Sequence, residues 1–260
     1  MNSTTGTRIR VATLDCRHAG GVAGLGRSKL DTVVAAIDAL GPAPQVLALT
    51  GTIGLRLFSD APLLALTQRL NDLLSDGDHY HPFLSERPGT RNPPGLWLSA
   101  QHLDVVADHH HTVEAFIGGV RLWLKTVQWQ HCDSSKEAFA QSSMDSQLAT
   151  VPAILLGSFI TSADLGDMPD VDRAETRFNI DAFQRLLDTG FWDAARAEAD
   201  LNPPVDAPGK PSIAHIVISH QTPARLVPGS YITGIHPDRA GSAGAACDLE
   251  LHPLAQQRPA

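Results

Sequence analysis

Apolar residues recur along this chain with two spacings, one typical of strands and one typical of helices. Residues 8–15 alternate between apolar and polar positions, and residues 46–50 and 153–159 are short branched apolar runs of the kind found in buried strands. Between them, residues 28–40 place their apolar side chains on one helical face, and Gly41 with Pro42 ends that pattern. The opening third of the chain therefore predicts strands that alternate with a helix.

The same two spacings continue to the end of the chain. They predict helices over residues 63–74, 134–149, 180–187 and 192–199, and strands over residues 95–100, 103–107, 115–129 (as two strands or one bent strand), 213–219, 230–234 and 247–252. Residues 78–81, 108–111 and 202–211 are predicted loops. Two strand-rich halves with helices between them predict an α/β or α+β sandwich, in which two sheets pack face to face under helices. No repeat or long linker divides the chain, so we expect one domain over residues 1–260 with its core at about 8–252.

Composition narrows the classes of partner. The chain has 260 residues, of which 43% are hydrophobic and 18% charged, as in an ordinary globular protein. A net charge of −8 without a Lys/Arg cluster makes nucleic acid an unfavourable partner. The apolar runs are too short to cross a bilayer and the N-terminus lacks a signal pattern, so we expect no membrane partner and a cytoplasmic location. The three cysteines are scattered along the sequence, which is the pattern expected of reduced thiols in a cytoplasmic protein.

Short phrases of sequence also occur in a recognisable order. They fall at residues 11–15, 45–51, 94–99, 153–161, 180–195, 213–219 and 247–251. Together they resemble the endonuclease/exonuclease/phosphatase superfamily, also called the DNase I-like fold. The resemblance implies a four-layer α/β sandwich of two packed, mainly antiparallel sheets flanked by helices. It also implies a divalent-metal site, and we expect the carboxyl-side loops of the strands to meet there at one mouth.

The chain departs from the family at the positions that carry the chemistry. The matching positions are Asp15 for an asparagine, Gly51 for a glutamate, Ser158 for an aspartate, Ile160 for an asparagine, Ala214 for an aspartate, and Ser242 in the region of a terminal Asp-His pair. A strand end that carries a histidine in the family falls at residues 126–128, without the histidine. Glycine, alanine, isoleucine and serine cannot hold Mg²⁺ or accept a proton near pH 7. We therefore expect no catalytic residues, no bound metal and no cofactor.

These substitutions leave three hypotheses for function. The leading one is a catalytically inactive pseudoenzyme that serves as a binding or regulatory scaffold for a protein or a small phosphorylated ligand. The alternative is a phosphodiesterase or phosphomonoesterase that uses Mg²⁺ or Mn²⁺ in a rearranged site, with candidate residues Asp15, Asp164, Asp193, His215 and His236. The third is a drifted chain with a marginal fold and no selected role. The sequence does not identify the ligand.

Overall fold

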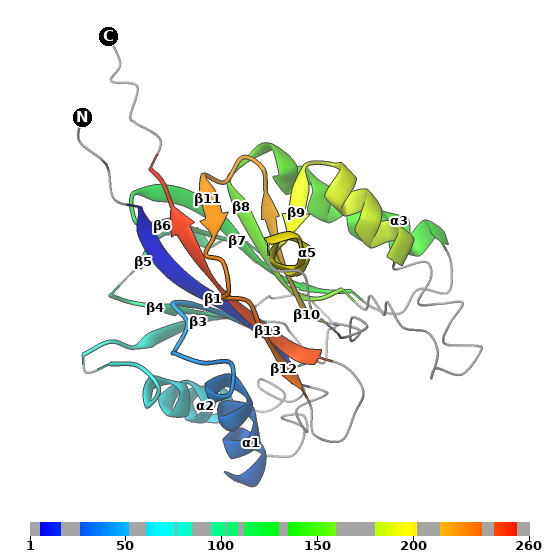
Figure 1. The fold of residues 1–260 in the computed structure, drawn as a ribbon. Helices are drawn as coiled ribbons and strands as arrows, with labels where there is room; N and C mark the ends of the chain where they lie inside the picture. Colours follow the sequence, from blue (N-terminus) through cyan, green and yellow to red (C-terminus); the bar gives the residue numbers. More distant parts are fainter. Residues whose placement is uncertain are drawn as a thin grey trace, which may run out of the picture.

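The computed structural model describes residues 6–16, 27–51, 61–75, 77–84, 95–101, 103–108, 112–129, 135–159, 180–201, 214–235 and 242–253. Within these ranges two sheets pack face to face, and helices cover the outer side of each sheet (Figure 1). This arrangement confirms the predicted four-layer α/β sandwich.

The first sheet is built around the amino-terminal strand. Among the described residues it has seven strands, in the order β11 (Ala224–Leu226), β13 (Ser242–Leu251), β1 (Thr7–Asp15), β2 (Val46–Thr50), β4 (Gly95–Ser99) and β3 (Tyr80–Leu84), while β12 (Ile232–Ile235) also pairs with β13. The pair β1 and β2 is parallel, and the other pairs are antiparallel. Because β1 pairs with both β2 and β13, segments from the two ends of the chain lie side by side at the centre of this sheet.

The second sheet uses the middle of the chain. Six strands in the described ranges run in the order β5 (Leu103–Asp108), β6 (Val113–Ile117), β7 (Val120–Gln128), β8 (Ala153–Ser158), β10 (Ala214–Ser219) and β9 (Phe191–Asp193). The pair β7 and β8 is parallel and the rest are antiparallel. Residues 115–129 thus form two strands, because Gly118 and Gly119 make a tight turn with φ values of 56° and 79°.

The main core lies between the sheets. Along β1, Ile9 and Val11 point into this space, where apolar residues of both sheets meet. Further along the strand, Ala12 and Leu14 point to the outer side of the sheet and pack with α1 (Arg27–Asp38) and α2 (Ala61–Asn71). Successive strand residues alternate between faces, so each strand contributes to two packed layers.

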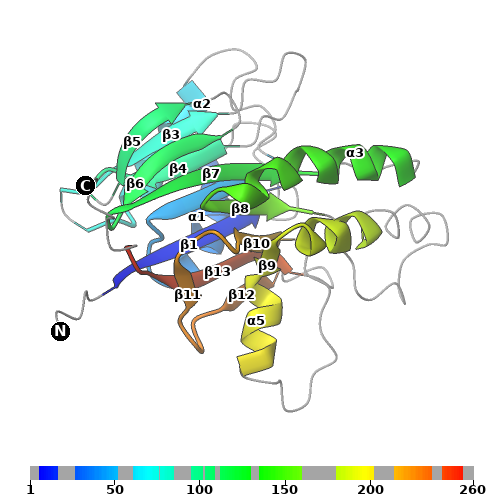
Figure 2. The same cartoon turned by 90° about the horizontal axis from the view of Figure 1, so that it is seen from above.

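The outer side of the second sheet is covered in the same way. It packs against α3 (Ser135–Ser146), the turn η1 (Gln147–Thr150) and a helix over residues 180–188. Trp129, Phe159 and Phe183 form an edge-to-face aromatic cluster in this layer, with ring centroids 5.1–6.4 Å apart. The helix α5 (Ala194–Leu201) stands at the side of the molecule, beside the edge strands β9 and β11 (Figure 2).

Several predicted elements need correction. Residues 192–199 are not helical throughout, since β9 occupies residues 191–193 before α5 begins. Residues 78–81 are not all loop: Tyr80 begins β3, is buried, and donates a hydrogen bond from its hydroxyl to the Pro44 carbonyl. Residues 109–111 and 202–211 lie outside the described residues. Among the helices that the structure describes, none is long and apolar enough to cross a membrane.

Candidate functional site

The space between the sheets turns from apolar to polar at one end. On β1 the inward positions continue from Ile9 and Val11 to Thr13 and Asp15, which are both buried. The other strands change in the same way, and six inward side chains together form what we call the polar layer: Thr13, Asp15, Thr50, Thr126, Gln128 and Ser158. Because apolar burial drives packing of the sheets, a buried polar layer is a departure that points to a site.

Strand register holds this layer together. Asp15 is the partner of Thr50 across β1 and β2. Ser158 has Gln128 as its partner on one side and Ala214 on the other. Four of the predicted site positions, namely Asp15, Gly51, Ser158 and Ala214, therefore lie at the same end of the sandwich.

A hydrogen bond joins the two sheets at this end. The backbone N–H of Gly51, just after β2, donates to the side-chain Oε1 of Gln128 on β7 at 3.1 Å. We call this end of the sandwich the mouth. The carboxyl ends of β1, β2 and β8 reach it as predicted, and the carboxyl end of β7 lies there too, but β10 and β13 run antiparallel to β8 and β1. The amino ends of these two strands reach the mouth instead, so the expectation of carboxyl-side loops was wrong for them.

The remaining family positions are described only in part. Ser242 begins β13, and Gly244 two residues later pairs with Leu14, which brings the backbone of Ser242 to the mouth. Ile160 lies outside the described residues. The mouth therefore gathers every matching position whose backbone the structure describes.

The rearranged site proposed as the alternative is divided between two faces. His215 and Asp193 are buried together, with 3.2 Å between Nδ1 and Oδ2. They lie on the outer face of the second sheet, where the rings of Phe159 and Phe183 contact His215. Asp15 points into the space between the sheets instead. Asp164 and His236 lie outside the described residues.

The donors of the polar layer do not suit a hard divalent cation. Mg²⁺ and Mn²⁺ are held in proteins chiefly by carboxylates, and the layer offers the carboxylate of Asp15 with hydroxyls and one amide around it. Among the described residues, no group of three or more His, Cys, Asp or Glu side chains is placed to hold a metal ion. Burial, and after it the negative charge of Asp15, raises the pKa of the neighbouring Cys16 thiol, which keeps that thiol protonated at neutral pH.

Three hydroxyls in the layer could not be recognised as site groups from the sequence. The Oγ1 atoms of Thr13, Thr50 and Thr126 are buried without a hydrogen-bond partner in the part of the chain that the structure describes. Leaving such a group unpaired costs about 1–3 kcal/mol, so these three hydroxyls hold hydrogen-bonding capacity that the described residues leave unused. The available signal was weak: a threonine or glutamine at the inward position of an otherwise apolar strand end.

The overall arrangement matches solved structures. A scan against protein-family models and a search of curated proteins each found no match. A humanized TDP2 from D. rerio is similar at a TM-score of 0.57 and 14% identity, over 94% of this chain and 99% of that chain. The human Nocturnin catalytic domain with bound sulfate anion gives 0.55 and 14%, over 94% and 95%. This chain has the DNase I-like fold.

A bacterial structure extends the comparison. An endonuclease/exonuclease/phosphatase family protein from Leptotrichia buccalis matches at a TM-score of 0.54 and 12% identity, over 94% of this chain and 99% of that chain. The resemblance predicted from short sequence phrases is thus confirmed for the fold. At this low identity the comparison shows the fold alone. The chemistry depends on the residues that this chain places at the mouth.

Proposed function

We propose that this chain is a catalytically inactive protein of the DNase I-like fold, a pseudoenzyme whose mouth serves as a binding or regulatory surface. One observation carries the proposal. Among the described residues of the polar layer Asp15 is the one carboxylate, and the family's acidic positions hold Gly51, Ser158 and Ala214.

Hydrolysis of a phosphate ester in this fold needs several groups together. A cation must be held by carboxylates, a base must take a proton from water, and a donor must stabilise the developing charge. Asp15 alone would hold Mg²⁺ weakly, and the hydroxyl of Ser158 would need an oriented base to act as a nucleophile. His215 does not supply that base, because it lies with Asp193 on the opposite face of the sheet.

The polar layer is better suited to binding. The hydroxyls of Thr50 and Thr126 can donate hydrogen bonds to an oxygen acceptor, such as a phosphate monoester or a peptide carbonyl. The net charge of −8 argues against long nucleic acid, whose binding depends on release of many counterions. We therefore favour a small phosphorylated ligand or a protein segment as the occupant of the mouth.

Hydrolysis assays test the inactive state directly. Wild type, Asp15→Ala and the matched surface control Asp72→Ala are assayed with bis-p-nitrophenyl phosphate and p-nitrophenyl phosphate in Mg²⁺ or Mn²⁺. We expect the rate of substrate hydrolysis with each of the three proteins to equal the rate in the metal-containing buffer alone. Turnover that coelutes with the protein, is lost in Asp15→Ala and persists in Asp72→Ala would contradict the proposal. That result would favour the rearranged site.

Binding measurements test the other half of the proposal. Calorimetry with Mn²⁺ should give no affinity tighter than about millimolar, or roughly −4 kcal/mol. p-Nitrophenyl phosphate, which we expect to remain intact, serves as the small phosphorylated ligand. Its titration should cause saturable shifts of the backbone amide NMR signals of Asp15, Gly51 and Ser158. If shifts at those residues do not saturate, the small phosphorylated ligand is ruled out and the protein segment remains.

A further inference from the structure

Two imidazoles lie next to each other at the edge of the first sheet. His79 comes just before β3 and His81 is the second residue of that strand, and their ring centroids are 4.7 Å apart with 68° between the ring planes. Successive strand residues alternate between faces, so both imidazoles project on one side and the buried Tyr80 between them projects on the other. His79 and His81 are both exposed, so the pair is open to ions from solvent.

This histidine pair lies away from the mouth. His81 is the strand partner of Leu98 on β4, and Leu98 is the partner of Val46 at the start of β2. Thr50 of the polar layer lies four residues further along β2, or roughly 13 Å of strand. Two steps between neighbouring strands, from β3 to β4 and from β4 to β2, add to this separation. The pair is therefore distinct from the place where the resemblance implied a metal site.

Hydrogen bonds fix the backbone that carries the pair. The backbone N–H of Tyr80 donates to the side-chain Oδ1 of Asn71 at 2.8 Å. One residue before the pair, Oδ1 of Asp78 accepts hydrogen bonds from the backbone N–H groups of His79 at 2.8 Å and Gln101 at 3.1 Å. A site that is held in place before a ligand arrives loses less entropy when the ligand binds. The carboxylate of Asp78 also brings a negative charge, which favours a cation nearby.

The spacing of the two rings fits two ligands of one metal ion. A transition metal lies about 2.0–2.1 Å from an imidazole nitrogen, and therefore about 3.2 Å from the ring centroid. At octahedral or tetrahedral angles, two rings on one ion have centroids about 4.5–5.2 Å apart, a range that includes the 4.7 Å between His79 and His81. Each ring can turn about its χ2 bond, which points through the ring, so a nitrogen can face the ion while the centroid stays in place.

Imidazole nitrogens select the class of ion. They suit Zn²⁺, Ni²⁺ and Cu²⁺, whereas Mg²⁺ prefers carboxylate, carbonyl and water oxygens. We propose that His79 and His81 together bind one divalent transition-metal ion of the class that favours imidazole, with water in its remaining coordination positions. Mn²⁺ is the weakest binder in the divalent transition-metal series, so this site agrees with the weak Mn²⁺ binding expected of the whole chain.

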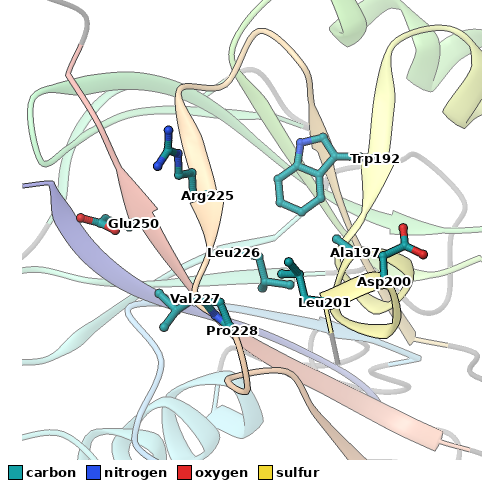
Figure 3. Close-up of a pocket in the computed structure, with 9 residues that line it drawn as sticks. All are labelled: Trp192, Ala197, Asp200, Leu201, Arg225, Leu226, Val227, Pro228 and Glu250. Carbon is teal, nitrogen blue, oxygen red and sulfur yellow. The ribbon is translucent and has the colours of Figure 1, made fainter. Parts of the chain in front are cut away.

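A carboxylate-lined cavity at the side of the molecule offers a contrasting environment. It has a volume of about 630 Å³ and lies where α5 meets β9 and β11 (Figure 3). Its described lining includes the carboxylates of Asp200 and Glu250 and no imidazole. A preference of the chain for Ni²⁺ over Mg²⁺ would therefore point to the histidine pair rather than to these carboxylates.

Calorimetry of the full chain, without an affinity tag, tests the proposal. Ni²⁺ should bind saturably, and Mg²⁺ should give no binding heat at the same concentrations. His79→Ala and His81→Ala should each weaken Ni²⁺ binding at least about tenfold, because the remaining imidazole cannot chelate the ion. Both side chains are exposed, so these variants should melt at the wild-type temperature. His220→Ala removes an exposed histidine outside the pair and should bind Ni²⁺ like wild type.

NMR locates the bound ion, since paramagnetic Ni²⁺ broadens the signals of nearby amides. Broadening should begin at the amides of His79, Tyr80 and His81. Residues 109–111 are three further histidines, so a variant with alanine at all three positions should keep the broadening at β3. No saturable Ni²⁺ binding, unchanged affinity in His79→Ala or His81→Ala, or no broadening at β3 would overturn the proposal. Asp15→Ala should bind Ni²⁺ like wild type, which separates this site from the function proposed for the mouth.

Discussion

The backbone N–H of Gly51 and the side-chain Oε1 of Gln128 are 3.1 Å apart, and their hydrogen bond links the two sheets at the mouth. Gly51 stands where the sequence resemblance places a metal-binding glutamate, and it adopts a φ of 64°. A neutral hydrogen bond between sheets thus occupies the place where the resemblance implied a metal ligand. The mouth is held by this bond together with the strand pairing around it.

Removal of the Gln128 amide should loosen the mouth. Gln128→Ala is expected to lower the free energy of unfolding by about 1 kcal/mol, the typical net value of one hydrogen bond. The matched control Gln68→Ala replaces an exposed glutamine on α2 and should change stability by less than about 0.5 kcal/mol. Urea unfolding of the three proteins measures both effects. Equal stability of the two variants would contradict the assigned role.

Gly157 should tolerate no side chain. It has a φ of 152°, and a Cβ there would lie 1.9 Å from the carbonyl oxygen of Val127 on the paired strand. Gly157→Ala should therefore destabilise the protein by more than about 4 kcal/mol or prevent folding. Gly229→Ala is the control, because its φ is also positive, at 75°, and nothing lies within 4 Å of its Cβ. It should cost only the backbone strain, about 1–2 kcal/mol. Thermal melts distinguish the two, and similar losses would show that crowding is unimportant.

The Arg10–Asp248 pair should contribute to stability through burial. Arg10 donates to Asp248 Oδ1 at 2.7 Å and to the Leu40 carbonyl just beyond α1 at 2.5 Å, whereas Arg8 contacts the same carboxylate from an exposed position. Arg10→Met should cost about 3–5 kcal/mol, because it removes the buried partner of a buried carboxylate and leaves Asp248 with the exposed Arg8. Arg8→Met should cost less than about 1 kcal/mol.

A double variant checks the cause of that loss. Arg10→Met combined with Asp248→Leu also removes the buried carboxylate that has lost its buried partner, so it should recover part of the stability lost in Arg10→Met. Urea unfolding of both single variants and the double variant provides the comparison. A double variant as unstable as the sum of its single changes would contradict the electrostatic explanation.

Stability should fall in alkaline solution. Burial raises the pKa of the Cys16 and Cys247 thiols above their ordinary value, with nearby carboxylates adding to the effect. Above about pH 8.5 the unfolded chain loses these protons while the folded chain keeps them, so the free energy of unfolding declines as pH rises. Each thiol contributes at most about 1.4 kcal/mol per pH unit.

A cysteine variant measures this contribution. In the double variant Cys16→Ala/Cys247→Ala, the free energy of unfolding should decline less steeply between pH 8 and pH 10 than in wild type. Between pH 6 and pH 7 the free energies of unfolding of the two proteins should change in parallel. Urea unfolding at these pH values gives the slopes. An unchanged alkaline slope would mean that the buried thiols do not cause the decline.

The sequence predicted the elements whose patterns are local. The strands β1, β2 and β8 and the helix α1 follow from spacing within a few residues. The strands β9 and β11 have three residues each, too few to give a periodic pattern, and they form because neighbouring strands supply their hydrogen bonds. Residues 242–246 of β13 are small and weakly β-prone, and pairing with β1 and β12 makes them a strand.

The candidate site divides in the same way. Residue types alone determined that Gly51, Ser158 and Ala214 bring no carboxylate to positions that the resemblance marks as functional. Tertiary structure decided which side chains share the mouth. It brought Gln128 to Gly51 and set His215 with Asp193 on the opposite face of the sheet. The reason is that pairing between distant segments sets strand register, and a shift of one residue would turn each side chain to the other face.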